Sequence, residues 1–136
     1  MGIQVKWDES AEHVIVYEFS DPWTWDEFVL AFETELEMAG TINDARYDVI
    51  VDVLNIKRVP GGSGITQVYT TFKRSPVNSG IAVILTESKF VISMFNVMKR
   101  VYPETESNYL IASDFESARE MIQNVRQHIQ IGRPSD

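Results

Sequence analysis

Cysteine is absent from the sequence. Its absence excludes disulfide bonds, thiol nucleophiles and thiolate metal sites, and it fits a cytoplasmic protein. Basic residues are few, because 12 Lys and Arg stand against 20 Asp and Glu and leave a net charge of −8. Binding to nucleic acids depends chiefly on Lys and Arg, so we expect no nucleic-acid partner.

Long apolar runs are also missing. The run at 81–85 is among the longest, whereas a helix that crosses a bilayer needs about 20 apolar residues. Residues 1–30 contain no basic start followed by an apolar stretch, which is the pattern of a signal peptide. We therefore expect neither a membrane span nor a signal peptide.

Motifs for catalysis and metal binding are not found. The sequence contains no H-E-x-x-H, no G-x-S-x-G and no cluster of metal ligands, and His13 and His128 lie far apart. Glu33, Glu35 and Glu37 alternate along a predicted helix, and this spacing favours a solvated helix face. We expect a protein that is not an enzyme and that holds no cofactor and no metal.

What is present is an ordinary globular composition. The chain has 136 residues, of which 44% are hydrophobic and 24% are charged. This length suits one domain, and a domain of about 150 residues buries enough surface to fold without a metal or a disulfide. We predict one domain over residues 1–131 and a frayed tail over 132–136.

Hydrophobic periodicity predicts strands that alternate with helices. Period-two patterns and β-branched runs predict five strands, at 3–7, 13–19, 47–56, 81–85 and 109–112. Apolar spacings of three and four predict four helices, at 25–39, between Gly64 and Ser75, at 89–101 and at 115–129. The order β-β-α-β-α-β-α-β-α indicates an α/β fold with a mixed, mostly parallel five-stranded sheet, whose first strand runs antiparallel to the second.

Short polar motifs predict where helices begin. Thr24 and Glu27 have the spacing of a capping box, and Ser113 and Glu116 have the same spacing before the last helix. Ser88 is expected to cap the third helix. We also expect the carboxylate of Asp52, at the end of a buried strand, to accept hydrogen bonds from neighbouring backbone N–H groups.

The segment VIVDVLNIKRVPGGSGITQV, together with the element order, resembles the STAS family, the sulfate-transporter and anti-sigma-factor-antagonist domains. In these domains an apolar strand ends in an Asp-containing stretch, and an Asp-Ser-Ser/Thr-Gly-Leu loop then opens a helix. Here Asp52 lies in the strand, and Ser63-Gly64-Ile65 stands on the Ser/Thr-Gly-Leu portion. The resemblance implies a non-catalytic regulator that acts through contact with a protein partner.

The resemblance also directs attention to one hydroxyl group. In antagonists that switch by phosphorylation, the modified Ser follows the Asp of the loop, but Gly61 and Gly62 stand at these two positions here. Ser63 is the only hydroxyl left in the loop, so a modification switch would use Ser63. The alternative role of Ser63 is that of a helix N-cap.

Two surfaces are candidate sites. The regulatory interpretation predicts a partner-binding surface at the start of the second helix, formed by Arg58, Gly62, Ser63, Gly64 and Ile65. The identity of the protein partner is left open.

The alternative function is a small-molecule or lipid carrier. In that interpretation Trp23 and Trp25 form the lip of an apolar pocket, since aromatic side chains anchor ligands and partners. A cavity of some hundreds of cubic ångströms would favour the carrier, whereas a filled core with an exposed apolar patch would favour the regulator. Pairing of the chain with itself is a third alternative.

Overall fold

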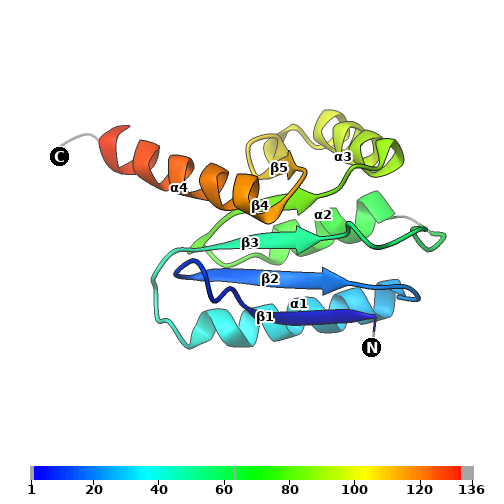
Figure 1. Cartoon of the computed structure of the whole chain (residues 1–136), viewed down its shortest axis with the longest axis horizontal. Helices are drawn as coiled ribbons and strands as arrows, with labels where there is room; N and C mark the ends of the chain where they lie inside the picture. The colour runs from blue at the N-terminus through cyan, green and yellow to red at the C-terminus, as the bar shows by residue number, and fades with distance from the viewer. Residues whose placement is uncertain (1, 63, 133–136) are drawn as a thin grey trace.

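A computed structural model describes residues 2–62 and 64–132. Five strands form one sheet in the order β1-β2-β3-β4-β5 (Figure 1). The strands are β1 Ile3–Trp7, β2 Val14–Phe19, β3 Tyr47–Asp52, β4 Ser79–Leu85 and β5 Tyr109–Ala112. The helices are α1 Trp25–Gly40, α2 Gly64–Arg74, α3 Lys89–Val101 and α4 Phe115–Gly132, with a short 3-10 turn, η1, at Pro103–Thr105. The predicted element order and mixed sheet are confirmed, with β1 antiparallel to β2 and the other pairs parallel.

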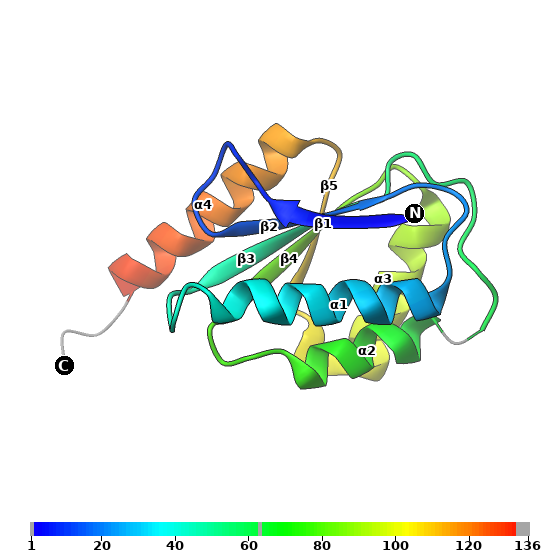
Figure 2. The same cartoon turned by 90° about the horizontal axis from the view of Figure 1, so that it is seen from below.

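The handedness of the crossovers distributes the helices over the two faces of the sheet. From β2 to β5 every strand lies beside the one before it, so α1, α2 and α3 each make a crossover in the same direction. Right-handed crossovers then place all three helices on one face. The final helix, α4, follows the last strand and is not bound by this rule. It covers the opposite face (Figure 2).

Two separate apolar layers result from this arrangement. The layer under α1, α2 and α3 includes Tyr17 and Phe19 of β2 and Phe95 of α3. The layer under α4 consists of the opposite side chains of the same strands, such as Val14 and Val16 of β2. Because side chains of a strand alternate between faces, near-continuous apolar runs are needed for strands buried on both sides.

Most predicted boundaries lie within a few residues of the observed ones, and two strands are shorter than predicted. The second strand begins at Val14 and not at His13, because His13 has a φ of 56° in the left-handed region. The third strand ends at Asp52 and not at residue 56. There the carboxylate of Asp52 accepts the backbone N–H of Leu54 at 3.0 Å, as expected, and the chain turns out of the sheet.

The helix starts follow the predicted caps with one exception. The capping box of Thr24 and Glu27 is present, and Ser88 caps α3. The predicted box of Ser113 and Glu116 is wrong, because Asp114 is the cap: its carboxylate accepts the backbone N–H of Ser117 at 2.7 Å. Of the predicted tail, Gly132 belongs to α4, and residues 133–136 lie outside the described residues.

A buried carboxylate joins α4 to the sheet. Asp48 of β3 is fully buried and forms ion pairs with Arg46 and with Arg126 of α4, at 2.7 and 2.8 Å. It also accepts the backbone N–H of Ile81 in β4 at 2.7 Å. Arg126 further donates to the carbonyl of His13, the residue before β2, at 2.9 Å, so this cluster connects α4 with β3, β4 and the start of β2.

We predict that Asp48→Asn lowers the free energy of unfolding by about 3 kcal/mol, because it leaves two arginines without their buried counter-charge. Urea denaturation would measure the change. The matched control is Glu33→Gln, which removes the exposed ion pair between Glu33 and Arg74 and should cost less than about 1 kcal/mol. Equal effects of the two variants would contradict the role assigned to Asp48.

Candidate functional site

An apolar cavity of about 300 Å³ lies between the sheet and the three helices that share its face. Its floor is formed by β2, β3, β4 and Tyr109 of β5, and α1, α2, α3 and the loops before α1 and α2 contribute to its other walls. α2 lies against α1 and α3, and its side chains Val68, Thr71 and Phe72 face the strands across the cavity. A cavity of this size is within the range of about 300–1,000 Å³ that is typical of ligand sites.

One part of the cavity wall is a cluster of aromatic rings. Trp23 and Trp25 both line the cavity, and their rings meet edge to face with centroids 4.8 Å apart. Phe19 packs edge to face on Trp23 at 4.8 Å, and Phe28 packs on Trp25 at 5.7 Å. The sequence order Trp-Thr-Trp places one ring before the capping residue and one at the first helical position, so the start of α1 holds both rings together.

The two tryptophans differ in their polar atoms. The indole N–H of Trp25 donates to the carbonyl of Pro60 at 3.1 Å. The indole nitrogen of Trp23 is buried, and it has no hydrogen-bond partner among the described residues. A buried donor without a partner is uncommon in folded proteins, and here it belongs to a side chain of the cavity wall.

A buried carboxyl group also lines the cavity. Glu35 of α1 is 5% exposed, and two tyrosine hydroxyls donate to it. The hydroxyl of Tyr17 in β2 donates to Oε1, and the hydroxyl of Tyr47 in β3 donates to Oε2 at 2.7 Å. Both oxygens of the carboxyl group are therefore bonded to phenols of the sheet, which is how a polar group becomes tolerable in an apolar layer.

Burial controls the titration of this group. Burial raises the pKa of Glu35 above its ordinary value, although the hydrogen bonds from Tyr17 and Tyr47 act in the opposite direction. Burial and the neighbouring Glu35 charge also raise the pKa of Tyr17, Tyr47 and Tyr109, so these phenols stay protonated. The tyrosines are thus fixed hydrogen-bond donors, and Glu35 is the one member of the group that changes its charge in ordinary buffers.

The prediction that Glu35 lies on a solvated helix face is wrong. Glu33 and Glu37 are exposed, but Glu35 is buried. Its position follows from the helical period: Phe28, Ala31, Phe32 and Ala39 lie three, four or seven residues from Glu35, and these residues form the inward stripe of α1. The spacing from these apolar residues, and not the alternation of the glutamates, was the signal that could have identified it.

The predicted partner-binding surface is only partly described. Ser63 lies outside the described residues. Arg58 and Gly62 are exposed, Ile65 is half-buried and Gly64 is buried. Gly62 has a φ of 110°, which glycine adopts without strain.

Gly64 connects this loop with the predicted lip. A Cβ at Gly64 would lie 2.8 Å from Cζ2 of Trp25, so the first residue of α2 must be a glycine for the ring to pack there. Together with the bond from Trp25 to Pro60, this contact makes the loop and the tryptophans neighbours. The structure therefore brings the two predicted sites side by side.

The titration of Glu35 generates a stability prediction. Because folding raises the pKa of Glu35 above 4.5, the folded protein holds this proton more tightly than the unfolded chain does. The stabilisation is complete below the ordinary pKa and is lost as the pH rises through the raised pKa. Relative to Glu35→Gln, the wild-type free energy of unfolding should therefore fall as the pH rises from the ordinary pKa of a glutamate through the raised pKa of Glu35.

Urea titrations at several pH values would measure this difference. Glu37→Gln is the matched control, because it makes the same change at an exposed position of the same helix. If the free energy of unfolding of the wild type and that of Glu35→Gln change in parallel with pH over the whole range, the raised pKa of Glu35 is contradicted.

Comparison with protein-family models, with curated proteins and with solved structures finds no match to this chain. Among the described residues, no group of three or more His, Asp or Glu side chains has the arrangement of a metal site. Likewise, no helix in the described part of the chain is long and apolar enough to cross a bilayer. The geometry of the cavity is thus the main guide to function.

Proposed function

We propose that this chain is a non-catalytic binding protein that carries a small, mostly apolar molecule in the cavity between α2 and the sheet. The observation that supports the proposal is the cavity itself. Protein interiors normally contain few voids larger than a water molecule. A pocket of about 300 Å³ that opens from the apolar layer to solvent is therefore unusual, and it offers space for a ligand.

The composition of this space strengthens the argument. Water is held poorly at an apolar wall because it needs several polar partners, whereas an apolar molecule would gain contacts with the lining side chains.

The lining fits a ligand that is apolar over most of its length. Phe28, Phe32 and Phe72 contribute aromatic walls, and Val49 and Val51 contribute aliphatic ones. Few polar groups interrupt this surface, which is the usual composition of a small-molecule site.

Titration with 1-octanol, followed by calorimetry, tests the proposal. We expect saturable binding to the wild type and at least about tenfold weaker binding to Val68→Phe. The larger ring would enter the cavity from α2, because Val68 is buried and lines it. Phe and Val have similar helix propensities, so the helix itself should persist.

Val101→Phe is the matched control, since it makes the same change on an exposed position of α3. Its affinity for 1-octanol should equal that of the wild type. The absence of saturable binding to the wild type, or an equal loss in both variants, would overturn the carrier proposal.

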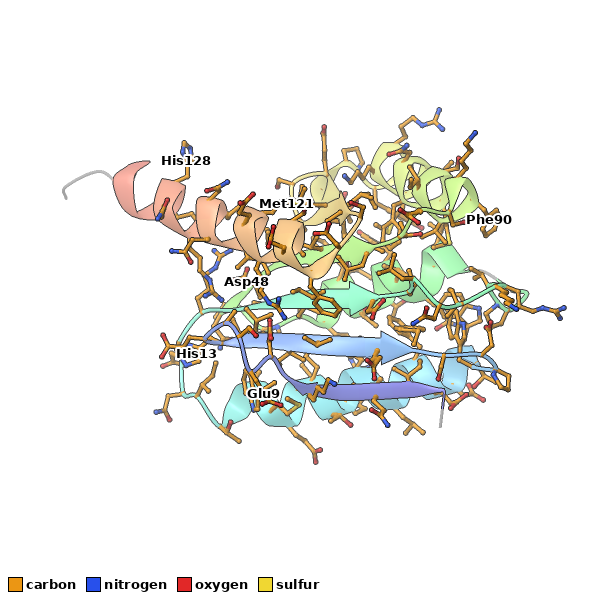
Figure 3. All side chains as sticks on the ribbon, viewed as in Figure 1. Glu9, His13, Asp48, Phe90, Met121 and His128 are labelled. Carbon is orange, nitrogen blue, oxygen red and sulfur yellow. The ribbon has the colours of Figure 1, made fainter. Side chains whose placement is uncertain are left out.

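The second candidate is the regulatory protein contact that the resemblance to the STAS family implies. The observation that favours it is a group of exposed apolar and basic side chains at the end of the molecule where the loop before α2 lies. Arg58 is exposed there, Leu54 is 38% exposed in the loop after β3, and Phe90 is 65% exposed in the first turn of α3. Figure 3 shows Phe90 at the end of the molecule opposite His128. Exposed apolar side chains beside a cation are common features of protein-binding surfaces.

An affinity pull-down from the host lysate tests the regulatory candidate. A specific partner should be lost or weakened with Arg58→Ala and with Ser63→Ala. It should be retained with Arg100→Ala, which removes an exposed arginine from the end of α3. If no partner is captured, or if all three baits capture it equally, this candidate fails.

A further inference from the structure

The carboxyl group of Glu35 has hydrogen-bond donors but no counter-ion among the residues that the structure describes. No Lys, Arg or His of the described residues forms an ion pair with it. Arg74 of α2, which packs its guanidinium over Phe32 of α1, pairs with Glu33 on the exposed side instead. Glu35 thus differs from the buried carboxylate of Asp48, which has two arginine partners.

The groups that face Glu35 from the other elements are all neutral. They are Tyr17 of β2 and Tyr47 of β3, which donate to it, and Tyr109 of β5, which lies close enough to sense its charge. Thr71 of α2 lines the same cavity, and its hydroxyl donates to the backbone carbonyl of Val68. Within residues 2–62 and 64–132, no positive charge therefore compensates an ionised Glu35.

The hydrogen-bond donors and acceptors near Glu35 that are still free determine which ligand group can bind there. Both tyrosine hydroxyl protons are used on the carboxyl oxygens, and the hydroxyl proton of Thr71 is used on its own helix. Around the carboxyl group itself, what remains is a set of acceptor lone pairs on the carboxylate and on the oxygens of Tyr17 and Tyr47, whereas the spare indole N–H of Trp23 lies elsewhere in the cavity wall. A ligand group that meets these acceptors must donate protons, and a positive charge would supply the counter-ion that the described residues lack.

We propose that the cavity takes an apolar amine, whose ammonium group lies against the carboxylate of Glu35 and whose hydrocarbon part lies among the aromatic rings. This inference rests on the proposed carrier function. An ammonium group has three donors and no acceptor, so it matches the acceptors at Glu35. The rings of Phe28, Phe32 and Tyr109 line the same cavity, and aromatic rings attract cations over their faces.

The negative charge and the free acceptors of Glu35 also disfavour a ligand with an anionic head group. A carboxylate or phosphate head would bring a second negative charge and more acceptors to a site that has no spare donor at Glu35. Like charges in a poorly solvated site disfavour each other strongly. Specificity would then come as much from this repulsion as from the attraction of the amine.

Calorimetric titration with three probes of equal chain length tests the inference: octylamine, 1-octanol and octanoate. At neutral pH we expect the wild type to bind octylamine at least about tenfold more tightly than 1-octanol, as a charge-assisted hydrogen bond allows. Octanoate should bind more weakly than 1-octanol. In Glu35→Gln the preference for octylamine should disappear while 1-octanol still binds, and Glu37→Gln, on the exposed face of α1, should behave as the wild type.

A measurement on the wild type alone keeps the test independent of the folding of the Glu35→Gln variant. Lowering the pH below about 4 protonates Glu35 but leaves octylamine charged. The advantage of octylamine over 1-octanol should therefore shrink toward none, with 1-octanol binding unchanged. Near the pKa of Glu35, octylamine binding should release a proton to the buffer, whereas 1-octanol binding should release none.

The outcomes separate this inference from the carrier proposal. If 1-octanol binds and octylamine binds no more tightly, the amine specificity is overturned and the carrier function stands. Tighter binding of octanoate than of octylamine has the same consequence. If the octylamine preference persists in Glu35→Gln, Glu35 is not its recognition site. If none of the three probes binds, the carrier function and the amine specificity are both overturned.

Discussion

The position of α1 depends on one carboxyl group that is buried in an apolar layer. Glu35 is tolerable there because Tyr17 and Tyr47, on neighbouring strands, each donate to one of its oxygens. A helix that slid or rotated by one residue would leave a buried carboxyl group without partners, which is among the most expensive errors in a protein core. The tyrosines therefore fix α1 across β2 and β3. With α1 fixed there and α2 lying against α1 and α3, the space over β3 and β4 remains as the cavity.

Asp48 of β3 and Glu35 of α1 illustrate two different roles of a buried carboxyl group. Asp48 is neutralised by two arginines and accepts a backbone N–H, so its charge is compensated within the chain and it joins α4 to the strands. Glu35 receives only phenol hydroxyls, and its charge is left to be removed by a proton or balanced from outside the chain. The first arrangement stabilises the fold. The second leaves an electrostatic requirement unmet inside a cavity, which is the kind of feature expected of a binding site.

The cavity and the loop before α2 are physically connected. Trp25 lines the cavity, donates its indole N–H to Pro60 of the loop, and packs where Gly64 begins α2. A molecule that touched Trp25 from inside would thus touch the residue that supports the exposed loop. The carrier and the regulator are different functions, but in this structure the residues proposed for them share one side chain.

The sequence by itself determined the element order and the mixed sheet, because both follow from the period of the apolar side chains. It also determined the capping box at Thr24 and the cap at Ser88, because a cap depends on contacts within a few residues. The aromatic pair Trp23 and Trp25 was also found from the sequence as a candidate lip. Glu35 was missed, because its surroundings come from β2 and β3, which lie at least 12 residues away along the chain. Only the tertiary structure decided that Glu35 meets Tyr17 and Tyr47 and that α2 leaves about 300 Å³ unfilled. A cavity is the space left between elements, and periodicity describes which face of each element is apolar but not how far apart two apolar faces come to rest.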